Sequence, residues 1–390
     1  MKRILYWGDS PLVGTGYGTV AKYILAALVG VGFSVDAVAL SSLGAVPPEH
    51  YPIRVQSVSV DGGDPYGTRA LQETLRTNRY DAVLVINDAA PLQLLHQVLA
   101  KLEHRPRVIA YLPIDWPLPE HAMRAAAACD RIVACANFAQ RLLQEGTRHD
   151  VVDLIPHGVD LGVFKPQRSD FRAELEARGL EPDRLLLTSI AVNSPKKNLP
   201  ALLQATAMVD RPRVALYVHA APVDSGGNLR DAAAELGLVE NRDVFFPAAA
   251  PPPHGPCSTQ ADVARILAGS DALVLSTRSE GWCLPVTEAF AVGCPVIAPA
   301  HTAIEEQARG RAILVPAEEL DWVGELGGYR PRIPPGEIAQ GIRTFARERG
   351  RRSQRERVRR ARAFAREHDW RRVTPSWVRL FREELRCRTR

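Results

Sequence analysis

Short apolar segments alternate with longer amphipathic segments along the first 155 residues. The apolar segments have the length of strands, whereas residues 17–29, 91–102 and 137–145 place apolar positions at helical spacing. Continuously apolar strands separated by helices predict a parallel sheet covered on both faces. The predicted strands are residues 4–7, 35–40, 53–60, 82–86, 108–112, 132–134 and 151–155.

The alternation restarts after a polar stretch, residues 165–183. Residues 199–208 are a predicted helix, and everything from about residue 336 onward is predicted to be helical. Residues 247–256, rich in Pro and Ala, and residues 319–335 predict surface loops. The predicted strands of this second series are residues 185–192, 214–219, 244–246, 272–276, 295–298 and 312–315.

Two such series predict an α/β protein with two doubly wound, Rossmann-like domains facing across a cleft. A length of 390 residues fits two domains of ordinary size. The expected organisation is an N-terminal domain at 1–165, a linker at 166–183, a C-terminal domain at 184–365 and a basic C-terminal helix at 366–390. Ligands of open parallel sheets bind beyond the carboxyl ends of the strands, so the loops there are the places to search.

Composition narrows the class of protein. Hydrophobic residues make up 46% and charged residues 24%, as in an ordinary globular chain. The nearest approach to a membrane span, residues 23–35, is too short and stops at Asp36, and the first residues do not resemble a secretory signal. None of the six cysteines forms a Cys-x-x-Cys pair, which excludes a zinc ribbon and favours reduced thiols in the cytoplasm.

Positive charge is concentrated at the C-terminus. The whole chain carries a net charge of +5, but residues 341–390 hold 18 arginines and 6 acidic residues, a net charge of +12. One interpretation is the solvated face of amphipathic helices. The other is contact with an anionic membrane surface or with nucleic acid, and Trp370 and Trp377 in this segment fit both. The expected location is therefore the cytoplasm, with peripheral attachment to the inner membrane face under the second interpretation.

A glycine-rich loop, Gly14-Thr15-Gly16-Tyr17-Gly18, follows the first predicted strand. Such a loop at a helix start lets the backbone approach an anion, although a plain tight turn is the alternative. It is not the dinucleotide-binding fingerprint, because Thr19 stands where a third glycine is required. Asp36 lies inside the second predicted strand, and a ribose would be reached only from its end.

Adjacent lysines follow the first strand of the second series. Lys196 and Lys197 lie just beyond the end of residues 185–192. Cations at the carboxyl end of a strand suit a phosphate or a leaving pyrophosphate, whereas an ordinary solvated loop is the alternative.

Two acids flank a predicted helix start after residues 272–276. Glu280 lies in the loop, and Glu288 lies about one turn into the helix that Pro285 begins. A pyrophosphate fits the helix N-terminus between them, and each carboxylate can accept hydrogen bonds from sugar hydroxyls. The arrangement predicts a nucleotide-sugar site, with one acid on the ribose and one on the transferred sugar.

These segments resemble the family-4 retaining glycosyltransferases of the GT-B fold. The most specific match is Glu280-x7-Glu288, continued by Ala-Phe-Ala-Val-Gly-Cys-Pro-Val-Ile at residues 289–297. The other matches are Ile-Pro-His-Gly-Val-Asp at 155–160, the loop at 14–18 and Lys-Asn-Leu at 197–199. The resemblance spans about residues 3–385, with the matches in family order.

The resemblance implies that the C-terminal domain binds a nucleoside-diphosphate-sugar, that the N-terminal domain binds the acceptor and that the final helices return to the N-terminal domain. Glu288 would bind the ribose hydroxyls, and Glu280 would face the donor sugar. Lys197 would stabilise the departing diphosphate, which Gly16 would approach from the other domain. The implied donor-binding set is Gly16, Lys196, Lys197, Glu280, Gly281, Trp282, Cys283, Leu284, Pro285, Val286 and Glu288, and the catalytic set is Asp115, Glu280 and Lys197.

Three positions depart from the family pattern. Val192 stands where the family often has arginine, and Ile114 stands where it often has histidine. Asp115 follows Ile114 and could orient or deprotonate the acceptor hydroxyl, the alternative being a loop acid that caps a helix. Cys283 stands where relatives often carry glycine, which predicts a narrower sugar pocket.

The predicted reaction is sugar transfer to a hydroxyl with retention, with the nucleotide-sugar as substrate and no cofactor. The chain has no Asp-x-Asp sequence, so no metal is expected. The alternatives are a nucleotide-sugar epimerase, an oxidoreductase (disfavoured by Thr19), a nucleic-acid-directed glycosyltransferase and a GT-B binding module without catalysis. The acceptor stays open among a glycan, a lipid, a natural product and a nucleic acid.

Overall fold

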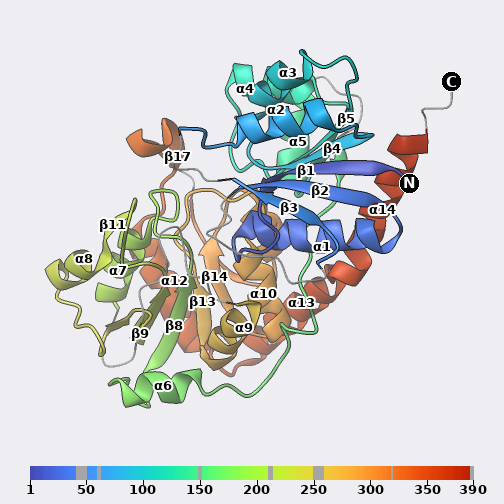
Figure 1. The fold of residues 1–390 in the computed structure, drawn as a ribbon. Helices are drawn as coiled ribbons and strands as arrows, with labels where there is room; N and C mark the ends of the chain where they lie inside the picture. The colour runs from blue at the N-terminus through green and yellow to red at the C-terminus, as the bar shows by residue number, and fades with distance from the viewer. Residues whose placement is uncertain are drawn as a thin grey trace. The chain divides into compact units, whose positions relative to one another are not determined.

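The computed structural model describes residues 1–40, 51–58, 63–147, 152–209, 214–248, 259–317 and 319–386 (Figure 1). The chain divides into two compact units. One consists of Met1–Gly158 with Trp370–Arg390, and the other of Val159–Asp369. The C-terminal segment thus returns to the N-terminal unit, as the family resemblance implies.

The N-terminal unit is built on a parallel sheet whose described strands follow the order β3-β2-β1-β4-β5-β6-β7. The order reverses between β1 and β4, which places a topological switch point at their carboxyl ends. The strands are β1 (Arg3–Asp9), β2 (Ser34–Leu40), β3 (Arg54–Ser57), β4 (Ala82–Ile86), β5 (Arg107–Leu112), β6 (Arg131–Ala134) and β7 (Asp153–Leu154). The helices are α1 (Gly16–Gly30), α2 (Thr68–Thr77), α3 (Leu92–Leu99), α4 (Glu120–Ala127), α5 (Asn137–Thr147) and α14 (Trp370–Arg386).

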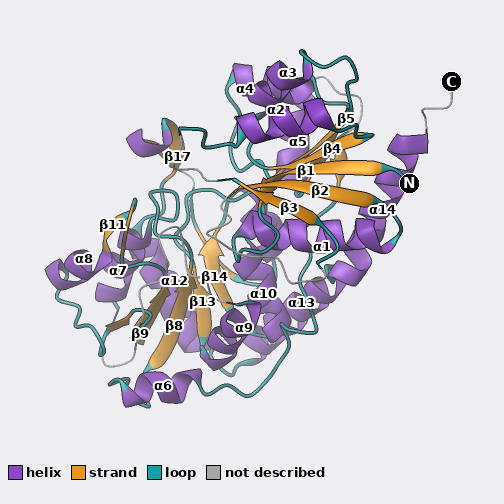
Figure 2. Cartoon of the chain, viewed as in Figure 1, coloured by secondary structure: helices purple, strands orange, loops and turns teal. Residues whose placement is uncertain are grey.

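The second unit repeats the plan with a parallel sheet of order β12-β9-β8-β13-β14-β15 (Figure 2). Its switch point lies between the paired strands β8 and β13. The strands are β8 (Leu185–Ile190), β9 (Val214–His219), β12 (Val244–Phe245), β13 (Ala272–Val274), β14 (Val296–Pro299) and β15 (Ile313–Val315). The helices are α6 (Phe171–Ala177), α7 (Leu199–Ala207), α8 (Leu229–Glu235), α9 (Gln260–Gly269), α10 (Leu284–Val292), α11 (Thr302–Ala308), α12 (Pro335–Glu348) and α13 (Arg352–Glu367).

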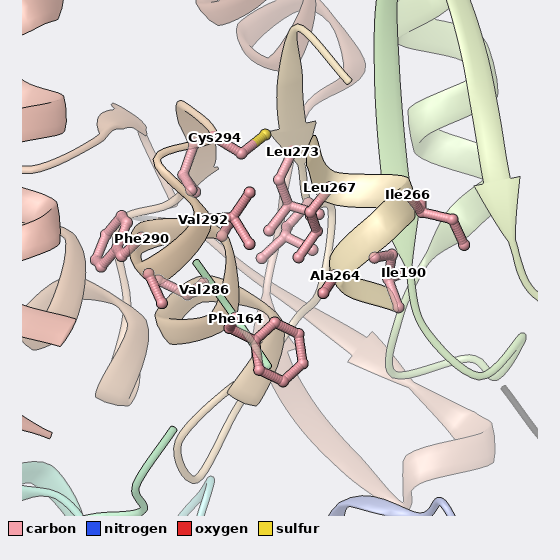
Figure 3. Close-up of a cluster of buried hydrophobic side chains, with 14 of the residues drawn as sticks. Phe164, Ile190, Ala264, Ile266, Leu267, Leu273, Val286, Phe290, Val292 and Cys294 are labelled. Carbon is pink, nitrogen blue, oxygen red and sulfur yellow. The ribbon is translucent and has the colours of Figure 1, made fainter. Parts of the chain in front are cut away.

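Apolar side chains fill both faces of the second sheet. Figure 3 shows one cluster, in which Val286 and Phe290 of α10 gather with Leu267 of α9 and Leu273 of β13. These side chains are at most 1% exposed. Because each large apolar side chain that leaves water contributes roughly 1.5–3 kcal/mol, this cluster fixes α10 on the sheet and with it the loop that precedes the helix.

Two segments predicted as irregular contain regular structure. Residues 319–335 hold an antiparallel hairpin, β16 (Leu320–Val323) and β17 (Gly328–Pro331), in which Trp322 pairs with Tyr329. The prediction of a plain loop was wrong because Pro and Gly masked two short strands. The polar stretch 165–183 contains α6, which buries Phe171 and Leu175. Short antiparallel strands β10 (Val223–Asp224) and β11 (Gly227–Asn228) follow β9.

Some predicted features lie outside the described residues: most of the loop at 247–256, the ends of the strands predicted at 53–60 and 151–155, and Cys257 and Cys387. The four described cysteines are buried and form no disulfide: Cys129, Cys135, Cys283 and Cys294. Across the part of the chain that the structure describes, no helix combines the length and the apolar character needed to cross a membrane.

Helix α14 is amphipathic and packs on the N-terminal sheet and α1. Trp370 stacks on Tyr23 of α1, with ring centroids 4.9 Å apart, and Trp377 makes an edge contact with Tyr111 of β5. The exposed arginines of this helix lie on the opposite face. The structure of α14 therefore fits the interpretation of the basic segment as the solvated face of an amphipathic helix.

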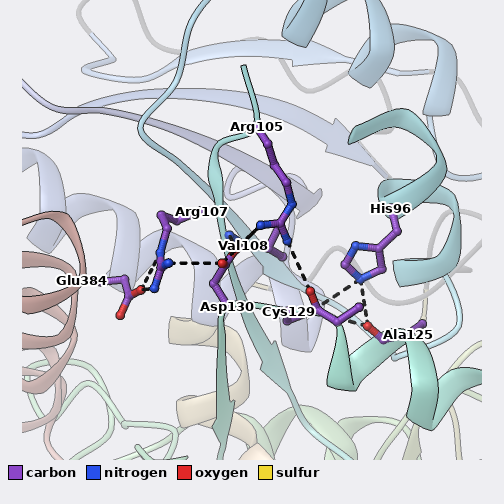
Figure 4. Close-up of polar contacts among 9 residues, drawn as sticks. His96, Arg105, Arg107, Val108, Ala125, Cys129, Asp130 and Glu384 are labelled. Atoms are coloured by element: carbon purple, nitrogen blue, oxygen red, sulfur yellow. Dashed lines mark hydrogen bonds and ion pairs between the residues drawn. The ribbon is translucent and has the colours of Figure 1, made fainter. Parts of the chain in front are cut away.

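An ion-pair network fastens α14 to the start of β5 (Figure 4). The Arg107 Nε atom donates to Glu384 of α14 at 2.7 Å, and an Arg107 amine lies 3.3 Å from Asp130. Asp130 also accepts the Val108 backbone N–H at 2.7 Å. The C-terminal helix is thereby fastened to the N-terminal unit, to which its residues belong.

Candidate functional site

A lysine and a carboxylate meet at the switch point of the second sheet. Residues 191–198 connect β8 to α7, and residues 275–283 connect β13 to α10. Lys197 Nζ lies 2.5 Å from Glu280 Oε1, and the two side chains are only 21% and 10% exposed. The two loops that the sequence analysis selected separately therefore form one site.

Hydrogen bonds that involve the backbone join these two loops to each other and to the start of α11. The Arg278 N–H donates to the Lys196 carbonyl at 2.8 Å, and the Ser276 hydroxyl donates to the Lys197 carbonyl at 3.0 Å. The Glu280 N–H donates to Thr302 Oγ1 at 3.2 Å. The Lys197–Glu280 pair is therefore positioned by neighbouring backbone as well as by its own attraction.

Left-handed backbone conformations recur at the helix starts of this site. Asn198, Cys283 and Thr302 have φ angles of 52°, 84° and 47°, and they lie at the starts of α7, α10 and α11. Asparagine adopts such angles more readily than other residues with a side chain, whereas at Cys283 and Thr302 the surrounding structure has to enforce them, and such strain clusters at functional sites. The cap residues at the N-termini of α7 and α10, Asn198 and Cys283, make no side-chain cap hydrogen bond.

A small pocket lies beside the ion pair. It encloses about 270 Å³, including space open to solvent. Lys197 and Glu280 line it together with Cys283 and Pro285 from the start of α10. Its remaining walls come from the end of β8, the first residue of α7 and the segment after β13: Ser189, Ile190, Ala191, Leu199, Leu275, Ser276 and Thr277. Positive charge and two helix N-termini beside a cavity suit an anionic ligand.

Glu288 lies inside α10 and is 9% exposed. Burial raises its pKa to about 8, because desolvation disfavours the carboxylate. The pKa of the Cys283 thiol is raised well above its ordinary value, first by burial and then by Glu280, with a smaller contribution from Glu288. Cys283 therefore lies near both acids of the Glu-x7-Glu motif.

The other predicted donor-binding residues occupy the same segment. Leu284 and Val286 belong to the first turn of α10, and Gly281 is buried in the loop before it. The Trp282 indole packs against Phe364 and His368, with ring centroids 6.4 Å and 5.3 Å away. The side chain of Trp282 thus fixes the loop to the end of α13, while its backbone stays next to the α10 N-terminus.

Gly16 and Asp115 belong to the N-terminal unit. Gly16 begins α1, and Asp115 follows β5. The Tyr17 hydroxyl donates to Asp88, which follows β4, at 2.7 Å. The pKa of Tyr17 is raised well above its ordinary value by burial, by Asp88 and, less strongly, by Asp115. The carboxyl ends of β4 and β5 thus bring two acids to the start of α1.

Other motif residues have structural roles. A Cβ atom on Gly18 would lie 2.7 Å from the Val13 carbonyl oxygen, so this glycine meets the needs of a tight turn. Asp36 accepts hydrogen bonds from Arg3 and from the Tyr80 hydroxyl, consistent with its place inside β2. Ile114 is buried in the core, and Val192 is 41% exposed.

Some residues with notable contacts were not predicted from the sequence. In the N-terminal unit, Asp88 lies two residues beyond the end of β4, in the kind of position from which the candidate residues of other loops were chosen. Thr302 accepts the Glu280 N–H, and the Gln307 side-chain amide donates to the Trp282 carbonyl. Neither residue belongs to a sequence motif that would have marked it. Ser189 lies within the buried strand β8, where a single serine does not indicate a binding site. Among the described residues, no group of three acids, histidines or cysteines is arranged to bind a metal.

Two family profiles match consecutive parts of the chain. Glycosyltransferase Family 4 matches residues 14–163, and Glycosyl transferases group 1 matches residues 183–325. Together they cover three quarters of the sequence. A D-inositol 3-phosphate glycosyltransferase of Actinosynnema mirum is 32% identical over 240 residues, which are 57% of this chain and 55% of that protein. One of Segniliparus rotundus is 33% identical over 153 residues, 38% of this chain and 31% of that protein. The matched stretches thus span from a third to just over half of these relatives' length.

Solved structures share the fold over nearly the whole chain. Sucrose-phosphate synthase from Thermosynechococcus elongatus has a TM-score of 0.77 at 16% identity, covering 98% of this chain and 99% of that one. HepE from Anabaena, in complex with UDP-glucose, has a TM-score of 0.75 at 17% identity, covering 98% and 100%. Because the two profiles follow one another in family order and the two sheets have the GT-B arrangement of strands, the chain belongs to the family-4 glycosyltransferases of the GT-B fold.

Proposed function

We propose that the protein transfers a sugar from a nucleoside-diphosphate-sugar to a hydroxyl acceptor with retention at the anomeric carbon. The observation that carries the proposal is the Lys197–Glu280 pair, at 2.5 Å, beside the uncapped N-terminus of α10. A cation and a helix N-terminus stabilise the negative charge of a departing diphosphate. The Glu-x7-Glu carboxylates then serve the donor's hydroxyls, Glu280 on the sugar and Glu288 on the ribose.

In the proposed reaction the bond between the anomeric carbon and the diphosphate oxygen breaks, and the electron pair leaves with the diphosphate. Lys197 and Lys196 supply positive charge, while the α10 amides near residues 282–286 and the α1 start at Gly16 meet the phosphates. The acceptor oxygen forms the new bond on the same face, and its proton goes to the leaving phosphate oxygen or to Asp115. No protein nucleophile and no metal take part.

The relatives suggest which substrates to test first. HepE has been solved with UDP and glucose and with UDP-glucose, and the relatives from Actinosynnema and Segniliparus are named for D-inositol 3-phosphate. We infer that a uridine nucleotide and a phosphorylated polyol are the first donor and acceptor to try. Ile114 and Val192 depart from the family pattern, so the panel of donors and acceptors extends beyond these two.

The test is thermal stability in the presence of UDP-, GDP-, ADP- and dTDP-sugars. A ligand that binds the native state raises the melting temperature. We expect one nucleotide class to stabilise the wild type and to have little effect on Glu288→Ala. Glu337→Ala, on the exposed first turn of α12, is the control and should respond like the wild type. A chain that responds to none of these sugars lacks the proposed donor site.

Turnover separates the remaining alternatives once a donor is found. Release of nucleoside diphosphate with a product of unchanged anomeric configuration, followed by NMR, supports retaining transfer. Conversion of the donor to an epimer without acceptor identifies an epimerase. Donor binding with no turnover over a broad panel of acceptors identifies a binding module.

We further propose that the exposed arginines of α13 contact an anionic membrane surface. Helix α13 buries Gln354, Ala361 and Ala365 and exposes a row of arginines on its other side: Arg352, Arg355, Arg359, Arg360 and Arg366. Each basic side chain near an anionic surface contributes about 1 kcal/mol. Binding to phosphatidylserine vesicles, weaker in high salt and in Arg359→Glu/Arg366→Glu, is the expected result. Binding to RNA or DNA and not to the vesicles would favour the nucleic-acid-directed alternative.

A further inference from the structure

Ser189 carries a buried hydroxyl that no other group of the described structure satisfies. It lies near the end of β8 and is 1% exposed, and its Oγ has no hydrogen-bond partner. Its neighbour Thr188 lies in the same strand, but the Thr188 hydroxyl bonds Ser270 Oγ at 2.6 Å. An unpaired buried hydroxyl costs about 1–3 kcal/mol, so a ligand that pairs with it recovers that free energy.

Ser189 lines the pocket beside the ion pair. Ser189, Lys197, Glu280 and Leu199, the first residue of α7, all belong to its wall. Side chains alternate along a strand, and Leu185 and Leu187, on the same face as Ser189, pack in the core cluster beneath α7. Ser189 therefore lies where this face reaches the pocket, below the start of α7.

The chemistry of the wall points to an anion. The start of α7 has no side-chain cap, the start of α10 has none either, and Lys197 adds an ammonium. With the Ser189 hydroxyl, these groups are all hydrogen-bond donors or positive ends of dipoles. Glu280 is the one acid among the lining residues, and Lys197 already neutralises it.

We propose that the Ser189 hydroxyl donates a hydrogen bond to the diphosphate of the bound nucleotide. This assignment rests on the proposed function, because it takes the diphosphate of the donor as the ligand. Ser189 then acts as a binding residue at the bottom of the diphosphate site, where Lys197 and the helix N-termini supply the charge. The hydroxyl is unpaired in the free protein and becomes paired only when the diphosphate arrives.

The experiment compares wild type, Ser189→Ala and Ser270→Ala. UDP and inorganic pyrophosphate are the probes, titrated by calorimetry, and the melting temperature of each free protein is recorded. Ser189→Ala should not lower the melting temperature of the free protein and should raise the Kd of both probes about tenfold, which is 1.4 kcal/mol. Ser270→Ala removes a hydroxyl bonded to Thr188 and to the Ile266 carbonyl, so it should lower the melting temperature and leave the Kd unchanged.

The outcomes separate this assignment from the proposed function. Equal Kd values for wild type and Ser189→Ala overturn the assignment, and so does a loss of stability in free Ser189→Ala as large as that in Ser270→Ala. If wild type binds UDP in a Glu288-dependent way while Ser189→Ala binds equally well, the function stands and the assignment fails. If pyrophosphate binds in a Ser189-dependent way but no nucleotide binds, the proposed function fails, and Ser189 binds a diphosphate that is not part of a nucleotide. Binding of neither probe overturns both.

Discussion

Lys197 and Glu280 are 83 residues apart in sequence, yet the lysine Nζ lies 2.5 Å from the glutamate Oε1. The contact exists because β8 and β13 are neighbours and both end at the same edge of the sheet. It brings the loops before α7 and α10 together, so that a charged pair lies beside the N-termini of both helices.

Replacing Lys197 with methionine should impair leaving-group departure. Loss of one group that stabilises developing negative charge typically lowers kcat by about 10²- to 10³-fold. We expect a loss of this size in the release of nucleoside diphosphate by Lys197→Met. Lys196→Met, at the adjacent position, should lose much less; an equal loss in both variants would contradict a specific role for Lys197.

The same pair should show energetic coupling in the free protein. Lys197→Met leaves a mostly buried Glu280 carboxylate without its cation, so it should destabilise more than Lys197→Met/Glu280→Gln does. Urea unfolding of the two single variants and the double variant should give a coupling free energy of about 1–2 kcal/mol. Additive effects would show that the ion pair does not form in solution.

Glu288 should make the free protein less stable as the pH rises. Its pKa is about 8 in the folded protein against 4.5 ordinarily, so over this window the unfolded chain holds fewer protons than the folded one. The stability that this group contributes is complete below about pH 4.5 and is lost progressively up to about pH 8, by at most about 1.4 kcal/mol per pH unit.

Urea unfolding across this pH range tests the effect. In Glu288→Gln the residue no longer titrates, so the decline in the free energy of unfolding between pH 5 and pH 8 should be shallower than in wild type. Glu337→Gln, at the exposed start of α12, should keep the wild-type profile. Identical profiles for wild type and Glu288→Gln would show that Glu288 titrates normally in the folded protein.

At position 283, glycine should give a more stable protein than alanine. The φ of 84° at Cys283 strains any residue with a Cβ atom, and strain of this kind costs about 1–3 kcal/mol. Cys283→Gly should therefore be at least about 1 kcal/mol more stable than Cys283→Ala, although it removes one more carbon. Buried Cys294, whose φ is not positive, is the matched control, and there the alanine variant should be the more stable.

Gly158 should tolerate no side chain. A Cβ atom on it would overlap the ring of Trp370, which is itself held by its stacking on Tyr23. Gly158→Ala should therefore lower the free energy of unfolding by about 1–3 kcal/mol, measured in urea. Gly30→Ala, where a Cβ atom meets nothing within 4 Å, should be neutral or stabilising. Equal stability of both variants would contradict the docking of α14 in solution.

Much of the fold was predictable because its signals are local. Continuously apolar strands and amphipathic helices can be recognised from a few consecutive residues. Residues 214–219, for example, were predicted as a strand with the same bounds as β9. The hairpin at 320–331 escaped because four-residue strands separated by glycines give too short a pattern. The positions of Glu280 and Glu288 relative to the start of α10 were also local and followed from their spacing.

The sequence by itself determined the alternation of strands and helices, the family and the segments that form the candidate donor site, since each depends on residues close together in the chain. Only the tertiary structure decided that Lys197 meets Glu280, that Cys283 adopts a positive φ and that Ser189 has no partner. These properties depend on which strands become neighbours and on how the loops beyond them pack. Both are set by contacts between residues tens of positions apart, which no local pattern records.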